Sequence, residues 1–113
     1  MSPGDIFVCD LGEPLGSEQG GHNGPVIVVS NPKACAFSDV IYVVPLTSKF
    51  KTYVPQHYSL YKIDYDCLKY DENIALCEQT RPVSKQRLRG KMGVINPEDL
   101  YQIVIRCKKN FPF

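Results

Sequence analysis

Apolar residues in this chain are gathered in short runs, separated by turns rich in proline and glycine. The run at residues 6–9 follows a Pro-Gly pair, and a continuous, mostly β-branched run fills residues 25–30. Residues 40–44 repeat this pattern. Because β-branched runs of this length are typical of buried strands, we predict a strand at each of the three. Two weaker strand candidates lie at residues 54–60 and 73–80.

Residues 12–25 interrupt the apolar pattern with glycines and polar side chains. The segment carries too little apolar surface to pack as a strand or a helix, so we predict a long loop. Loops of this length in compact domains are commonly functional.

The C-terminal segment changes to a helical period. Asn96 suits the N-cap, Pro97 suits the first helical position, and Lys108 and Lys109 suit the negative end of the helix dipole. Apolar residues at helical spacing would form one buried face. They are Leu100, Ile103, Val104, Cys107 and Phe111.

These elements together predict an α+β fold. The length of 113 residues fits a single domain that spans residues 1–113. We expect five or more strands in a small, strongly bent β-barrel, with the C-terminal helix covering an otherwise open sheet.

Composition narrows the class of protein. Hydrophobic residues make up 43% of the chain and charged residues 22%, with a net charge of +1. These values are ordinary for a globular protein. No apolar run approaches the roughly 20 residues that span a bilayer. The N-terminus carries no signal-like apolar core. We therefore expect a cytoplasmic protein with no membrane partner.

Five cysteines are present without a Cys-x-x-Cys pair. With two histidines, His22 and His57, a zinc site would need an unusual set of ligands, so we predict no metal. The favoured interpretation is buried free thiols in a reducing compartment. A cysteine nucleophile paired with one of the histidines stays open as an alternative, although no local motif supports it.

The charge is unevenly distributed. The segment 81–91 holds five basic residues and no acidic one, whereas residues 64–78 are acidic. Such a basic stripe is either a solvated face or a surface that binds phosphates.

Three blocks of sequence, in this order, resemble the MazF/PemK family of toxins. The first runs from Gly4-Asp5-Ile6-Phe7 through the Gly-Ser-Glu-Gln-Gly-Gly motif at residues 16–21 to the proline-led strand at Pro25. The second is the strand that ends on Thr47-Ser48. The third is Glu78-Gln79-Thr80-Arg81, followed by the Arg87-Leu88 pair. The similarity extends from about Gly4 through the C-terminal helix.

This resemblance implies an SH3-like barrel of the CcdB/PemK type, a homodimer, and cleavage of single-stranded RNA, including mRNA, in a groove of the dimer. Family members leave a cyclic phosphate and a free 5′ hydroxyl, and a cognate antitoxin with an acidic tail neutralises them. No cofactor is implied, because the 2′-hydroxyl nucleophile is already part of the substrate.

Cleavage of this kind needs proton transfer and donors to the phosphate oxygens. Thr47 at a strand end can offer its hydroxyl to a phosphate, although a threonine there also suits a strand for its β-propensity. Arg81, Lys85 and Arg87 are the natural phosphate contacts. The resemblance adds further candidates for RNA binding: Ser17, Glu18, Gln19, Asn23, Ser48 and Gln79.

One position departs from the family. An arginine that belongs to the family's catalytic groups precedes the proline of the second strand, but here Gly24 precedes Pro25 and the loop has one extra residue. His22 matches a histidine of some members, and its ordinary pKa of about 6.5 suits proton transfer. It is either a catalytic group or a plain loop residue. The chain is thus an active nuclease or a binding module for RNA or antitoxin. A gyrase-binding toxin of the same barrel is more remote.

Overall fold

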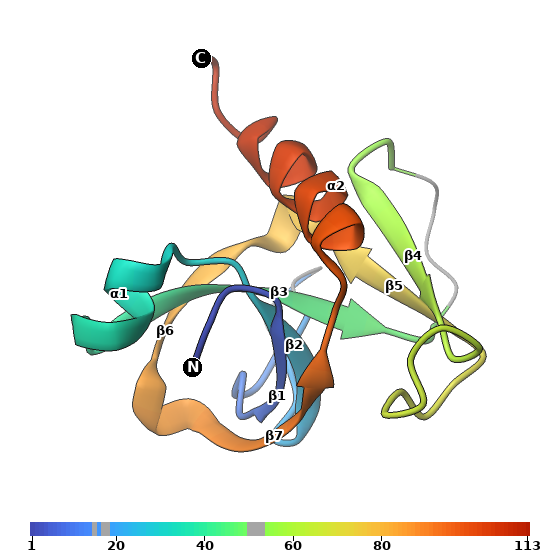
Figure 1. Cartoon of the computed structure of the whole chain (residues 1–113), viewed down its shortest axis with the longest axis horizontal. Coiled ribbons are helices and arrows are strands. Elements are labelled where there is room, and N and C mark those ends of the chain that lie inside the picture. The colour runs from blue at the N-terminus through green and yellow to red at the C-terminus, as the bar shows by residue number, and fades with distance from the viewer. Residues whose placement is uncertain (15, 17–18, 50–53) are drawn as a thin grey trace.

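The computed structural model describes residues 1–14, 16, 19–49 and 54–113. In this part of the chain a predominantly antiparallel sheet carries two α-helices and two short 3₁₀ helices (Figure 1). The strands are β1 (Asp5–Cys9), β2 (Gly24–Val28), β3 (Val40–Thr47), β4 (His57–Tyr61), β5 (Glu72–Leu76), β6 (Arg81–Ser84) and β7 (Leu88–Val94). The helices are α1 (Pro32–Phe37), α2 (Pro97–Lys108), η1 (Cys77–Gln79) and η2 (Lys85–Arg87).

The sheet bends at β3, which has two partners along one edge. The strand order is β4-β5-β3-β2-β1-β7, and β6 pairs with β3 outside this path. The first half of β3, up to Val43, pairs with β6, whereas Leu46 and Thr47 pair with β5. The sheet therefore divides where Pro45 stands, and its β4–β5 part turns away from the part that holds β6 (Figure 1).

Helix α2 begins and packs as the sequence predicts. The Asn96 side chain accepts a hydrogen bond from the Asp99 backbone at 2.8 Å, which satisfies one free N–H of the first turn. Ile103 and Cys107 are buried in the core cluster that the helix shares with the sheet. The prediction for Phe111 is wrong: the helix ends at Lys108, and Phe111 lies beyond it with 68% of its surface exposed.

The predicted strands at residues 6–9, 25–30 and 40–44 correspond to β1, β2 and β3, with shifted ends. The strand predicted at 73–80 is shorter, because the chain turns into η1 after Leu76. Both the backbone N–H and the hydroxyl of Thr80 donate to the Cys77 carbonyl, which closes this turn. The weak candidate at 54–60 forms β4 over a later range. Sequence reasoning missed α1, β6 and β7.

A second core cluster lies between β1, β2, β3 and β6, and its members include Cys9, Val26, Val43 and Val83. All five cysteines are free; four are buried and Cys67 is half-buried. The prediction of buried thiols is confirmed for those four. In the described part of the chain, no helix has the length and apolar character needed to cross a membrane.

Candidate functional site

Thr47 and Gly24 lie at neighbouring strand ends. Val26 pairs with Pro45 in the antiparallel β2–β3 ladder, so continuing the register by two residues brings Gly24 alongside Thr47. On its other side Gly24 pairs with Cys9 of β1. The position where the family carries its arginine therefore lies between Thr47 and the end of β1.

The Thr47 hydroxyl is fixed by the backbone. The residue is 6% exposed, and its Oγ1 accepts a hydrogen bond from the Lys49 N–H at 3.2 Å. A hydroxyl that accepts such a bond keeps its own proton to donate. Thr47 thus has the chemistry of a positioned donor to a phosphate oxygen, while Ser48, the next residue, is exposed.

Between β1 and β2, residues 10–14 lie alongside residues 19–23, and we call these two stretches the ribbon. The sequence predicted a long loop here. Leu11 N–H donates to the Gly21 carbonyl, and Gly21 N–H donates to the Gly12 carbonyl, both at 2.8 Å. A Cβ atom on Gly20 would lie 2.6 Å from Pro14 N and 2.8 Å from Gly12 O, closer than real contacts allow. Glycine at position 20 therefore lets the two halves approach.

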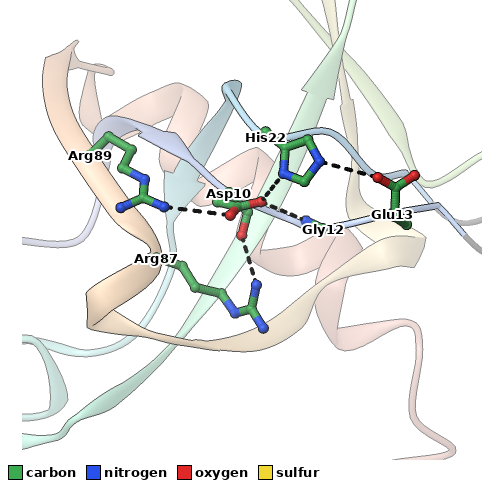
Figure 2. A network of polar contacts seen from close by, with 6 residues as sticks. All are labelled: Asp10, Gly12, Glu13, His22, Arg87 and Arg89. Atoms are coloured by element: carbon green, nitrogen blue, oxygen red, sulfur yellow. Dashed lines mark hydrogen bonds and ion pairs between the residues drawn. The ribbon is translucent and has the colours of Figure 1, made fainter.

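A polar network anchors the base of this ribbon (Figure 2). Asp10 Oδ1 lies 3.0 Å from His22 Nδ1 and also accepts the Gly12 N–H at 2.9 Å. His22 Nε2 lies 3.2 Å from Glu13 Oε1. On the other side, Arg89 Nη2 is 3.5 Å from Asp10 Oδ2, and Arg87 Nη1 donates to the Asp10 carbonyl at 3.3 Å.

The network shifts the pKa values of His22 and Asp10. Hydrogen bonds to Glu13 and to Asp10 raise the pKa of His22 above its ordinary value. The Gly12 N–H and the His22 ring lower the pKa of Asp10. His22 is therefore biased toward its cationic form, whereas the sequence suggested an unperturbed imidazole.

The basic stripe at 81–91 does not act as one surface. Arg87 and Arg89 contact Asp10, whereas Lys85 Nζ donates to the Cys35 carbonyl in α1 at 2.7 Å. Lys91 forms an ion pair with the buried Asp5 at 3.4 Å. Arg81 lies near the buried thiol of Cys9: burial raises the pKa of this thiol, and Arg81 and Arg87 oppose that rise.

The remaining predicted residues fall around the ribbon. The Gln79 side-chain oxygen accepts the Gln19 N–H, which ties the ribbon to η1. Asn23 is exposed just before β2. The predicted binding residues Ser17 and Glu18 lie outside the described residues.

One histidine–carboxylate pair was missed by sequence reasoning. His57 Nε2 lies 2.8 Å from Glu78 Oε2, and the His57 side chain is only 10% exposed. The two residues are 21 positions apart, so no local sequence motif indicates the pair. Among the described contacts, each histidine pairs with carboxylates and not with a cysteine. The open alternative of a cysteine–histidine nucleophile thus gains no support.

No cluster of three or more potential metal ligands occurs in the part of the chain that the structure describes.

Comparison with known families decides the class of protein. The family described as PemK-like, MazF-like toxins of type II toxin-antitoxin systems matches residues 2–111. The chain belongs to this family. Endoribonuclease MazF of Staphylococcus saprophyticus is 30% identical over 104 residues, which cover 91% of this chain and 84% of that protein.

Solved structures of MazF proteins share the fold. MazF from Deinococcus radiodurans superposes with a TM-score of 0.79 at 18% identity, covering 96% of this chain and 94% of its own. An endoribonuclease in complex with its cognate antitoxin, from a mycobacterial species, gives a TM-score of 0.75 at 19% identity, covering 100% and 98% of the two chains. The predicted α+β class, a mostly antiparallel sheet with a C-terminal helix, is thus confirmed as a MazF-like fold.

Proposed function

We propose that this MazF-family chain is a sequence-selective endoribonuclease that cuts single-stranded RNA, including mRNA, without a metal ion. The observation that carries the proposal is the position of Thr47. Its hydroxyl is held by a backbone N–H, and the residue lies beside the first residue of β2, directly after the part of the ribbon that carries His22. Phosphodiester cleavage requires a fixed donor to the phosphate together with titratable and cationic groups, and the segment that carries His22 leads into the strand beside Thr47.

In the proposed reaction the ribose 2′-oxygen attacks the adjacent phosphorus. The bond from phosphorus to the 5′ oxygen breaks, and the products are a 2′,3′-cyclic phosphate and a 5′ hydroxyl. Thr47 donates to a phosphate oxygen that gains negative charge. Arg81 and Arg87 bind flanking phosphates, together with Lys85 where the RNA reaches α1. Gln19, Asn23, Ser48 and Gln79 are proposed to contact the bases or sugars.

The wider biology is part of the same proposal. The chain is the toxin of a toxin-antitoxin pair, its sheet closes into an SH3-like barrel, and it acts as a homodimer that a cognate antitoxin neutralises. Support comes from the relative described as an endoribonuclease and from the mycobacterial endoribonuclease that was solved with its antitoxin.

The direct test is to incubate the purified protein with a long single-stranded RNA in EDTA and to map the ends of the fragments. We expect cuts at a short preferred sequence, with cyclic phosphate at one end and a 5′ hydroxyl at the other. Thr47→Ala, prepared in parallel, controls for a contaminating nuclease. Equal cleavage by the parent and this variant, or cleavage that stops in EDTA, contradicts the proposal.

A second candidate function is a binding module for RNA or antitoxin that has lost catalysis, and Gly24 favours it. A Cβ atom on Gly24 would meet no atom within 4 Å, so the Cβ of an arginine at this position would cause no clash. If the parent is inactive and Gly24→Arg cuts RNA, the binding module is the correct function. A supercoiling assay with gyrase tests the more remote gyrase-binding function, for which we expect no effect.

A further inference from the structure

Asp10 joins segments that lie far apart in the sequence. Its carboxylate contacts His22 and Gly12 in the ribbon and Arg89 in β7 (Figure 2). Its backbone carbonyl accepts a hydrogen bond from the Arg87 side chain in η2. The contacts to the arginines span 77 and 79 positions of sequence. Asp10 also follows Cys9, whose strand partner is Gly24. The residue thus lies at the junction of the ribbon, the basic residues and the strand ends.

The geometry around the imidazole favours its cationic form. Both ring nitrogens of His22 lie within hydrogen-bond distance of carboxylate oxygens, at 3.0 Å to Asp10 and 3.2 Å to Glu13. A neutral imidazole has one N–H, whereas the cation has two. The cation therefore satisfies both contacts, and the neutral ring satisfies one.

The two carboxylates differ in how firmly they are held. The Asp10 side chain is 22% exposed and has several partners, whereas the Glu13 side chain is 87% exposed. Solvent screens the outer contact more strongly, so Glu13 is the partner that a phosphate can replace. Asp10 then keeps its hydrogen bond to Nδ1, and this bond holds the ring so that its Nε2–H points toward the substrate.

We propose that Asp10 is a positioning residue for RNA cleavage, which holds the His22 imidazolium and the Arg87–Arg89 pair in one rigid cationic unit. The inference rests on the proposed endoribonuclease function and assigns His22 the part of general acid. As the bond from phosphorus to the 5′ oxygen breaks, His22 Nε2 gives its proton to that oxygen. The 2′-hydroxyl proton passes to solvent, and the neutral imidazole then regains a proton from solvent.

The expected pH dependence follows from the groups that face the imidazole. Asp10 and Glu13 contact the ring, and Arg87 and Arg89 contact Asp10 from η2 and β7. An acid must be protonated, so the cleavage rate falls as the pH rises through the pKa of His22. Removing the Asp10 charge lowers that pKa and moves this fall to lower pH.

The test combines an imidazole titration by NMR with pH–rate profiles on a long single-stranded RNA. Asp10→Asn keeps the shape and the acceptor oxygen but removes the charge. Asp10→Glu keeps the charge but lengthens the side chain. Asp66→Asn, at an exposed carboxylate between β4 and β5, makes the same change in net charge and is the matched control.

In Asp10→Asn we expect the His22 pKa to fall and the inflection of the rate profile to fall by the same amount. We also expect kcat on the plateau to drop by about 10- to 100-fold, as when a partner that orients a metal-bound histidine is lost, with KM nearly unchanged. Asp10→Glu should keep the inflection near the parent's and have an intermediate kcat. Asp66→Asn should match the parent in all three quantities.

An active parent whose Asp10→Asn variant keeps the parental His22 pKa overturns the inference. So does a variant whose imidazole titration shifts while its rate profile stays in place, because His22 is then not the acid. If the parent and Asp66→Asn both leave RNA intact, the proposed function fails, and the two failures are thus distinguishable. NMR spectra of both Asp10 variants establish whether they are folded, and Asp10→Glu decides the matter if Asp10→Asn is not.

Discussion

The roles proposed for Thr47 and His22 in RNA cleavage rest on different features of the two side chains. The threonine is buried and held by one backbone hydrogen bond, so its proposed role depends on a fixed position. The histidine side chain is 64% exposed and held by two carboxylates, so its proposed role depends on its charge. The smallest residue, Gly24, stands where the family places an arginine. At the residue scale, the proposed site therefore has its histidine cation in the ribbon and no arginine at the start of β2.

We expect Thr47→Ala to slow RNA cleavage by about 100- to 1,000-fold, the usual effect of losing one preorganised donor to a developing oxyanion. The variant should stay folded, because the hydroxyl accepts a single backbone hydrogen bond. Single-turnover cleavage rates and far-UV circular dichroism measure the two effects. Full activity in a folded variant would remove Thr47 from the site.

His22→Ala is expected to lower the cleavage rate by about 100-fold or more, in the range of general acid–base catalysis. Glu13 and Asp10 raise the pKa of His22, so the parent should keep its activity to a higher pH than an unperturbed imidazole allows. The parent's rate should then fall as the imidazole loses its proton. A profile that stays flat between about pH 5.5 and 8, which spans the titration of an ordinary imidazole, together with an active variant, would clear His22 and leave Arg81 as the alternative cation.

At the element scale, the ribbon between β1 and β2 determines where His22 lies. Two backbone hydrogen bonds join its halves at Leu11, Gly12 and Gly21, and Gln79 holds Gln19 against η1. The ribbon therefore carries His22 on a paired backbone, which limits how far the ring can move.

Gly20→Ala should disturb the ribbon and leave the core intact. The added Cβ would lie 2.6 Å from a backbone atom of Pro14, so the two halves must separate. A displacement of about 1 Å at a reacting group can cost about 100-fold in rate, and we expect a loss of that order with little change in melting temperature. Gly90→Ala in β7 is the control, because its Cβ would meet nothing within 4 Å. Equal rates in the two variants would mean that the approach of the halves is irrelevant to cleavage.

At the scale of the whole molecule, the basic residues and the main apolar groove lie on different parts of the surface. Burial raises the pKa of the Cys9 thiol, and the charges of Arg81 and Arg87 both oppose that rise, so the two arginines contribute positive charge on this side of the sheet. A groove of about 470 Å³ opens elsewhere, between α1, the outer face of β3 and the C-terminal part of α2. The first feature suits phosphates and the second suits another protein surface.

Neutralising Arg81 and Arg87 together should weaken RNA binding across sequences and flatten its dependence on salt. Each phosphate contact that is lost reduces the slope of log K against log salt by about 0.7 for single strands. Titrations at several salt concentrations measure the slope, and Lys33→Ala in α1 provides the control. An unchanged slope in the double variant would mean that the two arginines are merely solvated. An acidic antitoxin segment should compete with RNA for the same surface.

We predict a homodimer. Tyr101 and Ile105 form a second apolar pair on α2, but Ile105 is half-buried, and more apolar surface is exposed beside the groove. Phe37 is 83% exposed, Val40 48% and Tyr42 52%. Light scattering at micromolar concentration should report a dimer, Tyr42→Asp should shift it toward monomer, and Tyr101→Ser should not. A parent that is only monomeric would contradict the prediction.

How much of this protein could be predicted from sequence depended on whether the signal was local. The β-branched runs predicted β1 to β3, and Asn96 and Pro97 predicted the start of α2, because propensity and capping act within a few residues. α1, β6 and β7 were missed. β6 holds four residues and includes Pro82, and Gly90 and Gly93 interrupt the apolar pattern of β7. These strands exist because β3 and β1 supply their hydrogen-bond partners.

The sequence by itself determined the family, the strand that ends at Thr47, and the absence of an arginine before Pro25. Each of these is a matter of residue identity or short-range order. Tertiary structure alone decided that Asp10 meets Arg87 and Arg89, that Lys85 turns to α1, and that His22 lies between two carboxylates. The reason is physical: the charge state and direction of a side chain depend on neighbours brought from distant segments, and the packing of the sheet brings them there.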